Sequence, residues 1–266
     1  MKIKHNYILI ILIVFLFICI GNQGIAQELT GKEIIERTES IETLKDLRGD
    51  MEMQIINKSG KTRVRELTII GLENEKGVDK SLIRFIKPSK VKGTGFLSIS
   101  NPDGPDESYL YLPALGKPRR LSSEERGGNF MGSDFTNEDI SPSHEDYEHK
   151  LLNIEEVDGV AYYIVESVPG SDKIRQDVGF ARKLTWISKD KFQILKMEAM
   201  DINGKIIRVL TFANYQEVEK DAWIPTRMEM KTIESGSQTI LEYKNIRVNT
   251  GLTDDDFSIR QLTRPL

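Results

Sequence analysis

The sequence predicts a mainly β protein with a few helices, in which one strongly curved antiparallel sheet or barrel has a helix over its open face. After Met51, apolar and polar residues alternate in about eleven or twelve short segments, which is the pattern of half-buried strands. Turn sequences such as residues 57–60 and 202–204 join neighbouring segments, as in an antiparallel meander. So many strands must curve to bury a common face.

The N-terminus has the three parts of a secretory signal peptide. Lys2 and Lys4 precede an apolar run at residues 8–20, and the small residues Gly24 and Ala26 follow it. We expect cleavage after Ala26 and therefore a location in the periplasm.

Two alternatives to a cleaved signal remain open. A retained membrane anchor would use the same apolar run, which is shorter than the ~20 residues that span a bilayer. A lipoprotein signal would use Cys19, but the residue before it, Ile18, is bulky. Cleavage after Ala26 would leave residues 27–266 as a single β domain without cysteine, and hence without disulfides or thiolate chemistry.

The first predicted element of this domain is a helix near residue 30. Thr30 and Glu33 form a T-x-x-E capping box, and apolar residues then recur at roughly helical spacing up to Leu44. Gly49 breaks the pattern, and the strands begin.

The strands fall into two groups, separated by a segment without periodicity. Alternation and turns place them at residues 51–55, 62–70, 81–87, 95–100 and 108–112, and then at 150–156, 161–168, 180–188, 193–200, 205–215, 224–233 and 238–248. The segment between the groups, residues 113–148, is rich in proline, glycine and acidic residues. Loops of this length are usually functional or disordered, and short helices fit at residues 122–126 and 137–140.

Composition and motifs argue against several functions. The net charge of −4 shows no basic excess for nucleic-acid binding. A Gly-x-Ser-x-Gly elbow is absent, and residues 93–95 lack the strand-turn-helix context of a phosphate loop. His144 and His149 lie among carboxylates, but five residues apart on a strand they point to opposite faces, so we expect a solvated loop rather than a zinc site. We predict no enzyme, no metal and no cofactor, with a hydrolase using His144 as the weakest alternative.

One face of the predicted sheet is apolar. Strand parity assigns to it, as candidate cavity-lining residues, Met51, Met53, Ile55, Ile83, Phe85, Leu97, Ile99, Leu110, Leu112, Leu195 and Met197. Methionines among aliphatic side chains make an adaptable surface. The residues form either an ordinary filled core or the lining of a cavity for an acyl chain. One short helix is little cover for so many strands, which favours a partly open cavity.

The densest basic cluster directly follows the strand at residues 108–112. It consists of Lys117, Arg119 and Arg120 in an otherwise acidic chain. The cluster is either a solvated loop or the contact for a lipid phosphate or an acidic partner.

A series of motifs occurs in order along the chain, and the series covers about residues 82–262. They are V-K-G-T-G-F-L at 91–97, Y-L-Y-L-P-A-L-G-K-P-R-R-L at 109–121, G-S-D-F-T-N-E-D at 132–139, L-T-W-I-S-K-D at 184–190, I-L-K at 194–196, D-I-N-G-K at 201–205 and W-I-P-T at 223–226. In this order they resemble the outer-membrane lipoprotein-sorting proteins, a family with the LolA-like fold of periplasmic lipoprotein carriers. The resemblance implies a half-open barrel whose helices lid an apolar cavity, with no enzyme activity or cofactor.

The resemblance also implies a function in lipid transport. We expect a periplasmic carrier or chaperone that binds a lipid, or the acyl chains of lipoproteins, for transfer toward the outer membrane. Its partners would be an inner-membrane exporter and an outer-membrane acceptor. The alternative is a non-catalytic accessory domain of an envelope lipid exporter, with a filled core and a contact at residues 117–120.

Overall fold

The computed structural model describes residues 28–41, 44–73, 78–100, 106–142 and 147–266. The expected signal peptide, its cleavage site and His144 therefore lie outside the described residues.

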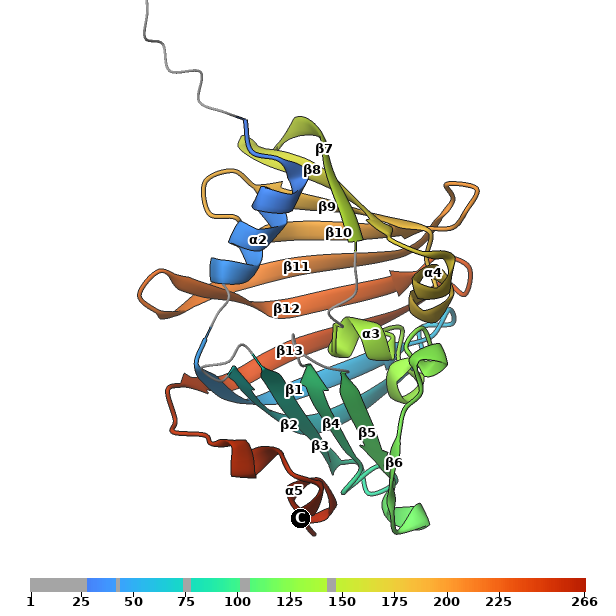
Figure 1. Cartoon of the computed structure of the whole chain (residues 1–266). Coiled ribbons are helices and arrows are strands. Elements are labelled where there is room, and N and C mark those ends of the chain that lie inside the picture. The colour runs from blue at the N-terminus through green and yellow to red at the C-terminus, as the bar shows by residue number, and fades with distance from the viewer. Residues whose placement is uncertain (1–27, 42–43, 74–77, 101–105, 143–146) are drawn as a thin grey trace, which may run out of the picture.

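Thirteen strands form one antiparallel sheet (Figure 1). They are β1 (Asp46–Ile56), β2 (Thr62–Glu73), β3 (Asp79–Lys87), β4 (Gly95–Ser100), β5 (Glu107–Tyr111), β6 (Pro118–Arg120), β7 (Tyr147–Val157), β8 (Val160–Pro169), β9 (Arg182–Ser188), β10 (Ile194–Met200), β11 (Ile206–Glu219), β12 (Ala222–Thr232) and β13 (Ser237–Val248). The prediction of a mainly β chain with a curved antiparallel sheet is confirmed.

The order of the strands follows the chain from the middle to one edge and then from the other edge back to the middle. The order is β6-β5-β4-β3-β2-β1-β13-β12-β11-β10-β9-β8-β7, so β1 pairs with β13 and the sheet does not close into a barrel. Because β6 and β7 lie at opposite edges, the connection between them must cross one side of the sheet. This requirement explains why the long predicted segment does not simply project into solvent.

Short helices lie over both sides of the sheet. They are α2 (Gly31–Ile41), η1 (Pro113–Leu115), η2 (Ser123–Glu125), η3 (Phe130–Gly132), α3 (Asn137–Ile140), α4 (Asp172–Val178), η4 (Asp254–Phe257) and α5 (Ile259–Thr263). The predicted capping box is present, since the Glu33 carboxylate accepts a hydrogen bond of 2.8 Å from the Thr30 amide and the Glu33 amide donates to Thr30 Oγ1. Sequence patterning missed β6 and α4.

The inner face of the sheet is the side that carries Met53 and Phe85. Residues 121–142, here called the inner cover, lie on this side, and their Phe130 and Phe135 are buried against the strand residues. The rings of Phe130 and Phe96 meet edge to face with centroids 5.3 Å apart. The helix α2 lies over β7 and β8 and buries Ile34 there (Figure 1).

The outer face is different, and one part of it is sealed by the end of the chain. Residues 249–266, here called the C-terminal segment, bury Phe257 and Leu262 against Leu82 and Leu97. Arg84 donates to the backbone carbonyls of Gln261, at 2.7 Å, and of Arg264.

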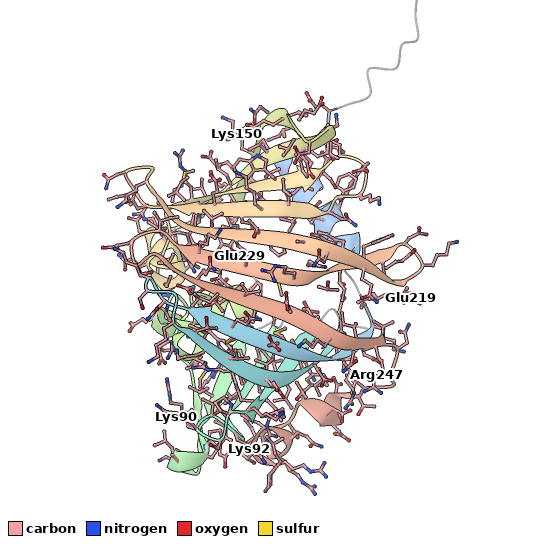
Figure 2. All side chains as sticks on the ribbon, turned by 180° about the vertical axis from the view of Figure 1, so that it is seen from behind. Lys90, Lys92, Lys150, Glu219, Glu229 and Arg247 are labelled. Atoms are coloured by element: carbon pink, nitrogen blue, oxygen red, sulfur yellow. The ribbon has the colours of Figure 1, made fainter. Side chains whose placement is uncertain are left out.

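The rest of the outer face carries charged side chains that pair between strands and along one strand. Lys244 lies 2.7 Å from Glu52, and Arg227 pairs with Glu242 and with Glu229, which is labelled on this face in Figure 2. The inner and outer faces therefore differ in chemistry as the alternation predicts.

Candidate functional site

A strip of partly exposed apolar side chains runs across the inner face between α2 and the inner cover. It is formed by Met197 on β10, Phe212 on β11, Met228 on β12 and Tyr243 on β13, and we call it the inner strip. Phe212 lies directly opposite Met228, and Met228 lies opposite the buried Leu241, so the strip is continuous across the register. Each member packs against the buried cluster and keeps part of its surface in solvent.

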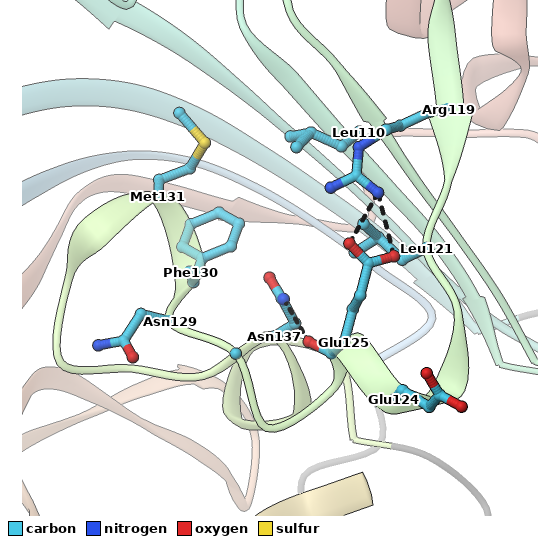
Figure 3. A pocket seen from close by; sticks show the side chains of 10 residues that line it. Leu110, Arg119, Leu121, Glu124, Glu125, Asn129, Phe130, Met131 and Asn137 are labelled. Atoms are coloured by element: carbon cyan, nitrogen blue, oxygen red, sulfur yellow. Dashed lines mark hydrogen bonds and ion pairs between the residues drawn. The ribbon is translucent and has the colours of Figure 1, made fainter.

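A pocket of about 390 Å³ lies where the inner cover meets β5 and β6 (Figure 3). Its walls come from Leu110, Arg119, Leu121, Glu124, Glu125, Gly128, Asn129, Phe130, Met131 and Asn137. The volume lies within the range of about 300–1,000 Å³ that is usual for small-molecule pockets. Since Phe130 also belongs to the buried inner cluster, the pocket adjoins the apolar interior.

Two arginines on β2 attach the inner cover to the sheet. Arg65 donates to the Met131 carbonyl at 2.7 Å, and Arg63 donates to the Gly132 carbonyl at 3.3 Å. Met131 has φ of 50°, a left-handed conformation that is uncommon for a residue with a side chain. The cover is thus attached through carbonyls at a strained turn.

A buried carboxylate makes the second attachment of the inner cover. Asp134 accepts hydrogen bonds from the hydroxyls of Thr232, Ser237 and Thr239, at 2.8 and 2.7 Å for the two threonines. Its own amide donates to Thr239 Oγ1 at 2.9 Å. A buried carboxylate is tolerated only with such partners.

Two charged side chains of this region, Arg65 under the inner cover and Glu125 at the rim of the pocket, have shifted pKa values. Burial lowers the pKa of Arg65, and the neighbouring Arg63 lowers it further. The pKa of Glu125 is lowered by the hydrogen bond from the Ser122 amide and by Arg119, which donates to both carboxylate oxygens at 2.8 and 3.0 Å. The rim of the pocket therefore carries an ion pair, drawn dashed in Figure 3.

A partly buried lysine lies at the far end of the inner face. Burial lowers the pKa of Lys183, whose ammonium is 5.8 Å from the ring centroids of both Tyr147 and Phe180. Nearby, Arg208 on β11 pairs with Asp139 of α3 at 2.7 Å and holds that helix against the sheet.

The structure brings most of the predicted cavity residues together on the inner face. The buried inner cluster contains Met51, Met53, Ile55, Ile83 and Phe85. Leu110 and Met197 pack against this cluster, and Leu110 also lines the pocket. Whether these side chains contact a ligand stays a prediction.

Leu97 and Ile99 were expected on the inner face, and this placement is wrong. Leu97 pairs with Leu82, whereas Phe96 pairs with the inward-facing Ile83. Leu97 and Ile99 therefore lie on the outer face beneath the C-terminal segment. Apolar residues occur on both faces of β4, so alternation alone gave no unique answer.

Leu112 and Leu195 are also displaced from the expected row. Leu112 follows the last residue of β5, and Leu195 lies at a bulge where the β9–β10 register shifts between Ile194 and Lys196. Both are partly exposed, and neither belongs to the apolar clusters found among the described residues.

The predicted basic cluster is divided by the fold. Lys117 is exposed in the turn between β5 and β6. Arg119 is held by Glu125, and Arg120 lies 3.5 Å from Glu107. Their proposed role as a partner or head-group contact stays a prediction.

Sequence reasoning missed Phe130, Phe135, Phe212 and Met228. The two phenylalanines lie in the segment without periodicity, where no parity rule applies, although isolated aromatics in a polar loop are a usable signal of packing. Phe212 and Met228 lie on predicted strands and face inward by simple alternation.

Metal and membrane features are limited in the described part of the chain. It contains no group of three histidine, cysteine, aspartate or glutamate side chains arranged to hold a metal ion. His149 lies among the described residues, and its Nδ1 forms a hydrogen bond of 2.9 Å with Ser167 Oγ. Burial lowers the pKa of His149. Within the same residues, no helix has the length and apolar character that a bilayer crossing requires.

Comparisons with known proteins are consistent over most of the chain. A family model whose description reads "uncharacterized protein" matches residues 77–264. No curated protein sequence matches the chain. A candidate outer membrane lipoprotein-sorting protein domain from Vibrio parahaemolyticus has a similar structure, with a TM-score of 0.81 and 33% identity over 88% of this chain and 98% of that one.

Two further structures share the architecture. A DUF1329 family protein from Desulfovibrio piger has a TM-score of 0.79 and 28% identity, covering 87% of this chain and 97% of that one. A LolA superfamily protein from Nitrosomonas europaea has a TM-score of 0.68 and 20% identity, covering 87% and 98% of the two chains, and it supports the fold alone.

Proposed function

Because the chain belongs to the family of outer-membrane lipoprotein-sorting proteins, we propose that it is a lipid-binding carrier of the periplasm. Its cargo is a lipid, or the acyl chains of a lipoprotein, bound on the inner face. Its partners in this proposal are an inner-membrane exporter that loads it and an outer-membrane acceptor that unloads it.

The inner strip is the observation that carries the proposal. Met197, Phe212 and Met228 keep apolar surface in solvent in the middle of a face that is otherwise covered from both sides. Methionine and aromatic side chains adapt to chains of different length and shape. The pocket beside Phe130 offers further apolar wall to the same ligand.

The energetics of such a site need no catalysis. Each methylene group withdrawn from water contributes about 0.8 kcal/mol, so an acyl chain binds through burial alone. Carriage also requires release, and release requires a cover that can move. Asp134 and Asp139 fix one part of the inner cover to the sheet. The turn at residues 131–132 is attached only through the hydrogen bonds of Arg63 and Arg65 to backbone carbonyls among the described residues, which makes this turn the candidate moving part.

A second reading is a non-catalytic accessory domain of an envelope lipid exporter. The fully buried phenylalanines Phe85, Phe96, Phe130 and Phe135 favour it, because they already fill much of the inner face. In that case a partner protein, rather than a lipid, covers the inner strip.

Native mass spectrometry of protein recovered from the periplasm, followed by organic extraction, tests the proposal. A bound acyl species is the expected result. Titration with a fluorescent fatty acid then compares Phe212→Glu with Thr211→Glu, a matched control because Thr211 is exposed on the opposite face of β11. Phe212→Glu should weaken binding at least about tenfold, since it places a charge in the acyl site.

Circular dichroism of both variants checks that each has folded, so that weaker binding is not caused by lost structure. If Phe212→Glu does not fold, Met228→Gln replaces it, because the amide is polar and close to methionine in size. A protein that carries no lipid and binds no fatty acid would refute the carrier and favour the accessory domain.

A further inference from the structure

Two neighbouring turns at one end of the sheet form an exposed basic tip. Leu115 of η1 is 60% exposed, and Lys117 follows it in the β5–β6 turn. Lys90 and Lys92 project from the turn between β3 and β4 (Figure 2). The turns touch, because a Cβ at Gly93 would lie 3.2 Å from the Pro113 ring. Leu115, Lys90, Lys92 and Lys117 together are called the basic tip.

The backbone holds this tip in shape. In the β3–β4 turn the amides of Val91 and Lys92 donate to the Pro88 carbonyl at 3.0 and 3.1 Å. In the other turn the Gly116 amide donates to the Pro113 carbonyl at 3.1 Å, with Gly116 at φ of 67°, a conformation that favours glycine. The tip is therefore formed before any partner arrives.

The charge of the tip is not neutralised by the protein around it. Among the described residues, no ion pair involves Lys90, Lys92 or Lys117, whereas Arg119 and Arg120 on the adjoining strand are paired with glutamates. The nearest glutamates along the chain after β6 lie in η2, which contacts α4 rather than the tip. Three lysines without an ion pair in the described part of the chain thus lie on two touching turns that also carry the exposed Leu115, in a chain of net charge −4.

We propose that the basic tip docks on the surface of an anionic phospholipid bilayer. Leu115 enters the boundary between head groups and acyl chains, and the three lysines contact lipid phosphates. An apolar side chain with lysines on its own turn and on the neighbouring turn matches this boundary, where both kinds of group are satisfied at once. An acidic protein would also satisfy the lysines, but lysine is depleted at protein interfaces, so the observations favour the bilayer.

This docking is independent of the inner face, and it goes beyond the proposed carrier function. It supplies a way for a carrier to meet a membrane: the tip approaches the lipid surface, while cargo is held by the inner strip and the pocket. Substitutions at the tip should therefore leave fatty-acid binding unchanged.

Vesicle flotation measures the docking directly. Protein recovered from the periplasm is mixed with vesicles of equimolar phosphatidylglycerol and phosphatidylethanolamine, or with vesicles of phosphatidylcholine alone. We expect binding to the anionic vesicles only, weakening as salt is raised. Leu115→Ser should reduce the partition coefficient about tenfold. Reversal of all three lysines to glutamate should reduce it about a hundredfold.

Matched controls carry the same chemical changes elsewhere. Ile202→Ser alters a side chain that is 78% exposed in the β10–β11 turn, and glutamates at Lys45, Lys205 and Lys220 reverse three exposed lysines outside the tip. Both controls should float like the wild type. Absence of wild-type binding, or equal loss in controls and tip variants, would overturn the proposal. Loss on charge reversal with none in Leu115→Ser would also overturn it, because the lysines would then bind the head groups without entry of the leucine into the bilayer.

Discussion

The sheet is covered on each of its two faces by a segment without strands, and the two covers are built differently. The C-terminal segment on the outer face buries Leu262 completely and exposes only 3% of Phe257. The inner cover also buries two phenylalanines, but a pocket of about 390 Å³ adjoins it, and the half-exposed inner strip shares its face. One cover seals its face and the other leaves apolar surface available.

Each cover is attached to the sheet through a carboxylate, but the inner cover also has a sparsely held turn. Asp46 accepts four hydrogen bonds, two from Thr250 and one each from the amides of Gly251 and Leu252, at 2.6 to 3.2 Å. On the inner side, Asp134 accepts hydrogen bonds from Thr232, Ser237 and Thr239. The turn before it is held more sparsely, by Arg65 through the carbonyl of Met131, which has a left-handed conformation, and by Arg63 through the carbonyl of Gly132. The dense sets of bonds at Asp46 and Asp134 fix both covers to the sheet, whereas the two arginine bonds at a strained turn suit a part of the inner cover, residues 131–132, that moves.

The largest expected effect comes from breaking the seal on the outer face. Leu262→Ala should lower the free energy of unfolding by about 2–5 kcal/mol, because it leaves a cavity in a fully buried cluster. Urea unfolding followed by the fluorescence of Trp186 and Trp223 measures the change. Fatty-acid binding at the inner face should persist under native conditions.

The exposed face of the same helix supplies the control for Leu262→Ala. Ile259 on α5 is 40% exposed, so Ile259→Ala should cost less than about 1 kcal/mol. Equal losses for the two variants would contradict the description of the C-terminal segment as a seal.

The second largest loss of stability is expected from a change at Asp46, the carboxylate that attaches the C-terminal segment to the sheet. Burial alone would raise the pKa of Asp46, but the hydrogen bonds from Thr250, Gly251 and Leu252 outweigh it and lower the pKa. Asp46→Asn turns one acceptor into a donor that faces two amides, and should cost about 2–3 kcal/mol near neutral pH.

The pH dependence of that loss follows from the sign of the shift. A lowered pKa stabilises the fold above the unfolded value of about 3.9, and this contribution disappears as pH falls through the folded value. The difference between wild type and Asp46→Asn should therefore be constant above about pH 5 and shrink below about pH 4. Urea midpoints across this range measure it, and a difference that does not change with pH would contradict the role of the charge.

The comparison of the covers also shows how far the sequence predicts this molecule. Alternation placed Met51, Met53 and Ile55 on one face correctly, because β1 has charged or amide groups between them. It misplaced Leu97 because β4 is buried on both faces, and only the pairing of Leu82 with Leu97 shows which side each residue takes. Where both faces of a strand are buried, apolar and polar residues no longer alternate, so the sequence pattern cannot assign a residue to one face.

The covers themselves were the harder part to predict. Thr253 and Asp256 form a capping box at the start of η4, but no local sequence pattern shows that this turn packs under β3 and β4. The inner cover lies where it does because β6 and β7 occupy opposite edges of the sheet. That is a property of long-range pairing, which residues 113–148 do not encode in their own pattern.

The smallest effect on stability, and the sharpest test of the comparison, comes from Arg65→Met. Methionine keeps an apolar stem near Phe85 but cannot donate to the Met131 carbonyl. The lost hydrogen bond is offset by relief from burying a charge, so the free energy of unfolding should change by less than about 1 kcal/mol. Amide hydrogen exchange at residues 130–133 should nevertheless rise about tenfold, and fatty-acid dissociation should become faster.

Arg84→Met is the counterpart on the outer face. Arg84 holds two carbonyls of the C-terminal segment, at Gln261 and Arg264, so its loss should raise exchange there and leave residues 130–133 and fatty-acid dissociation unchanged. If Arg65→Met leaves exchange and dissociation as in the wild type, the inner cover is as fixed as the outer one. An acyl chain could then bind only on the exposed surface of the inner strip, because a cover that does not loosen cannot admit it beneath.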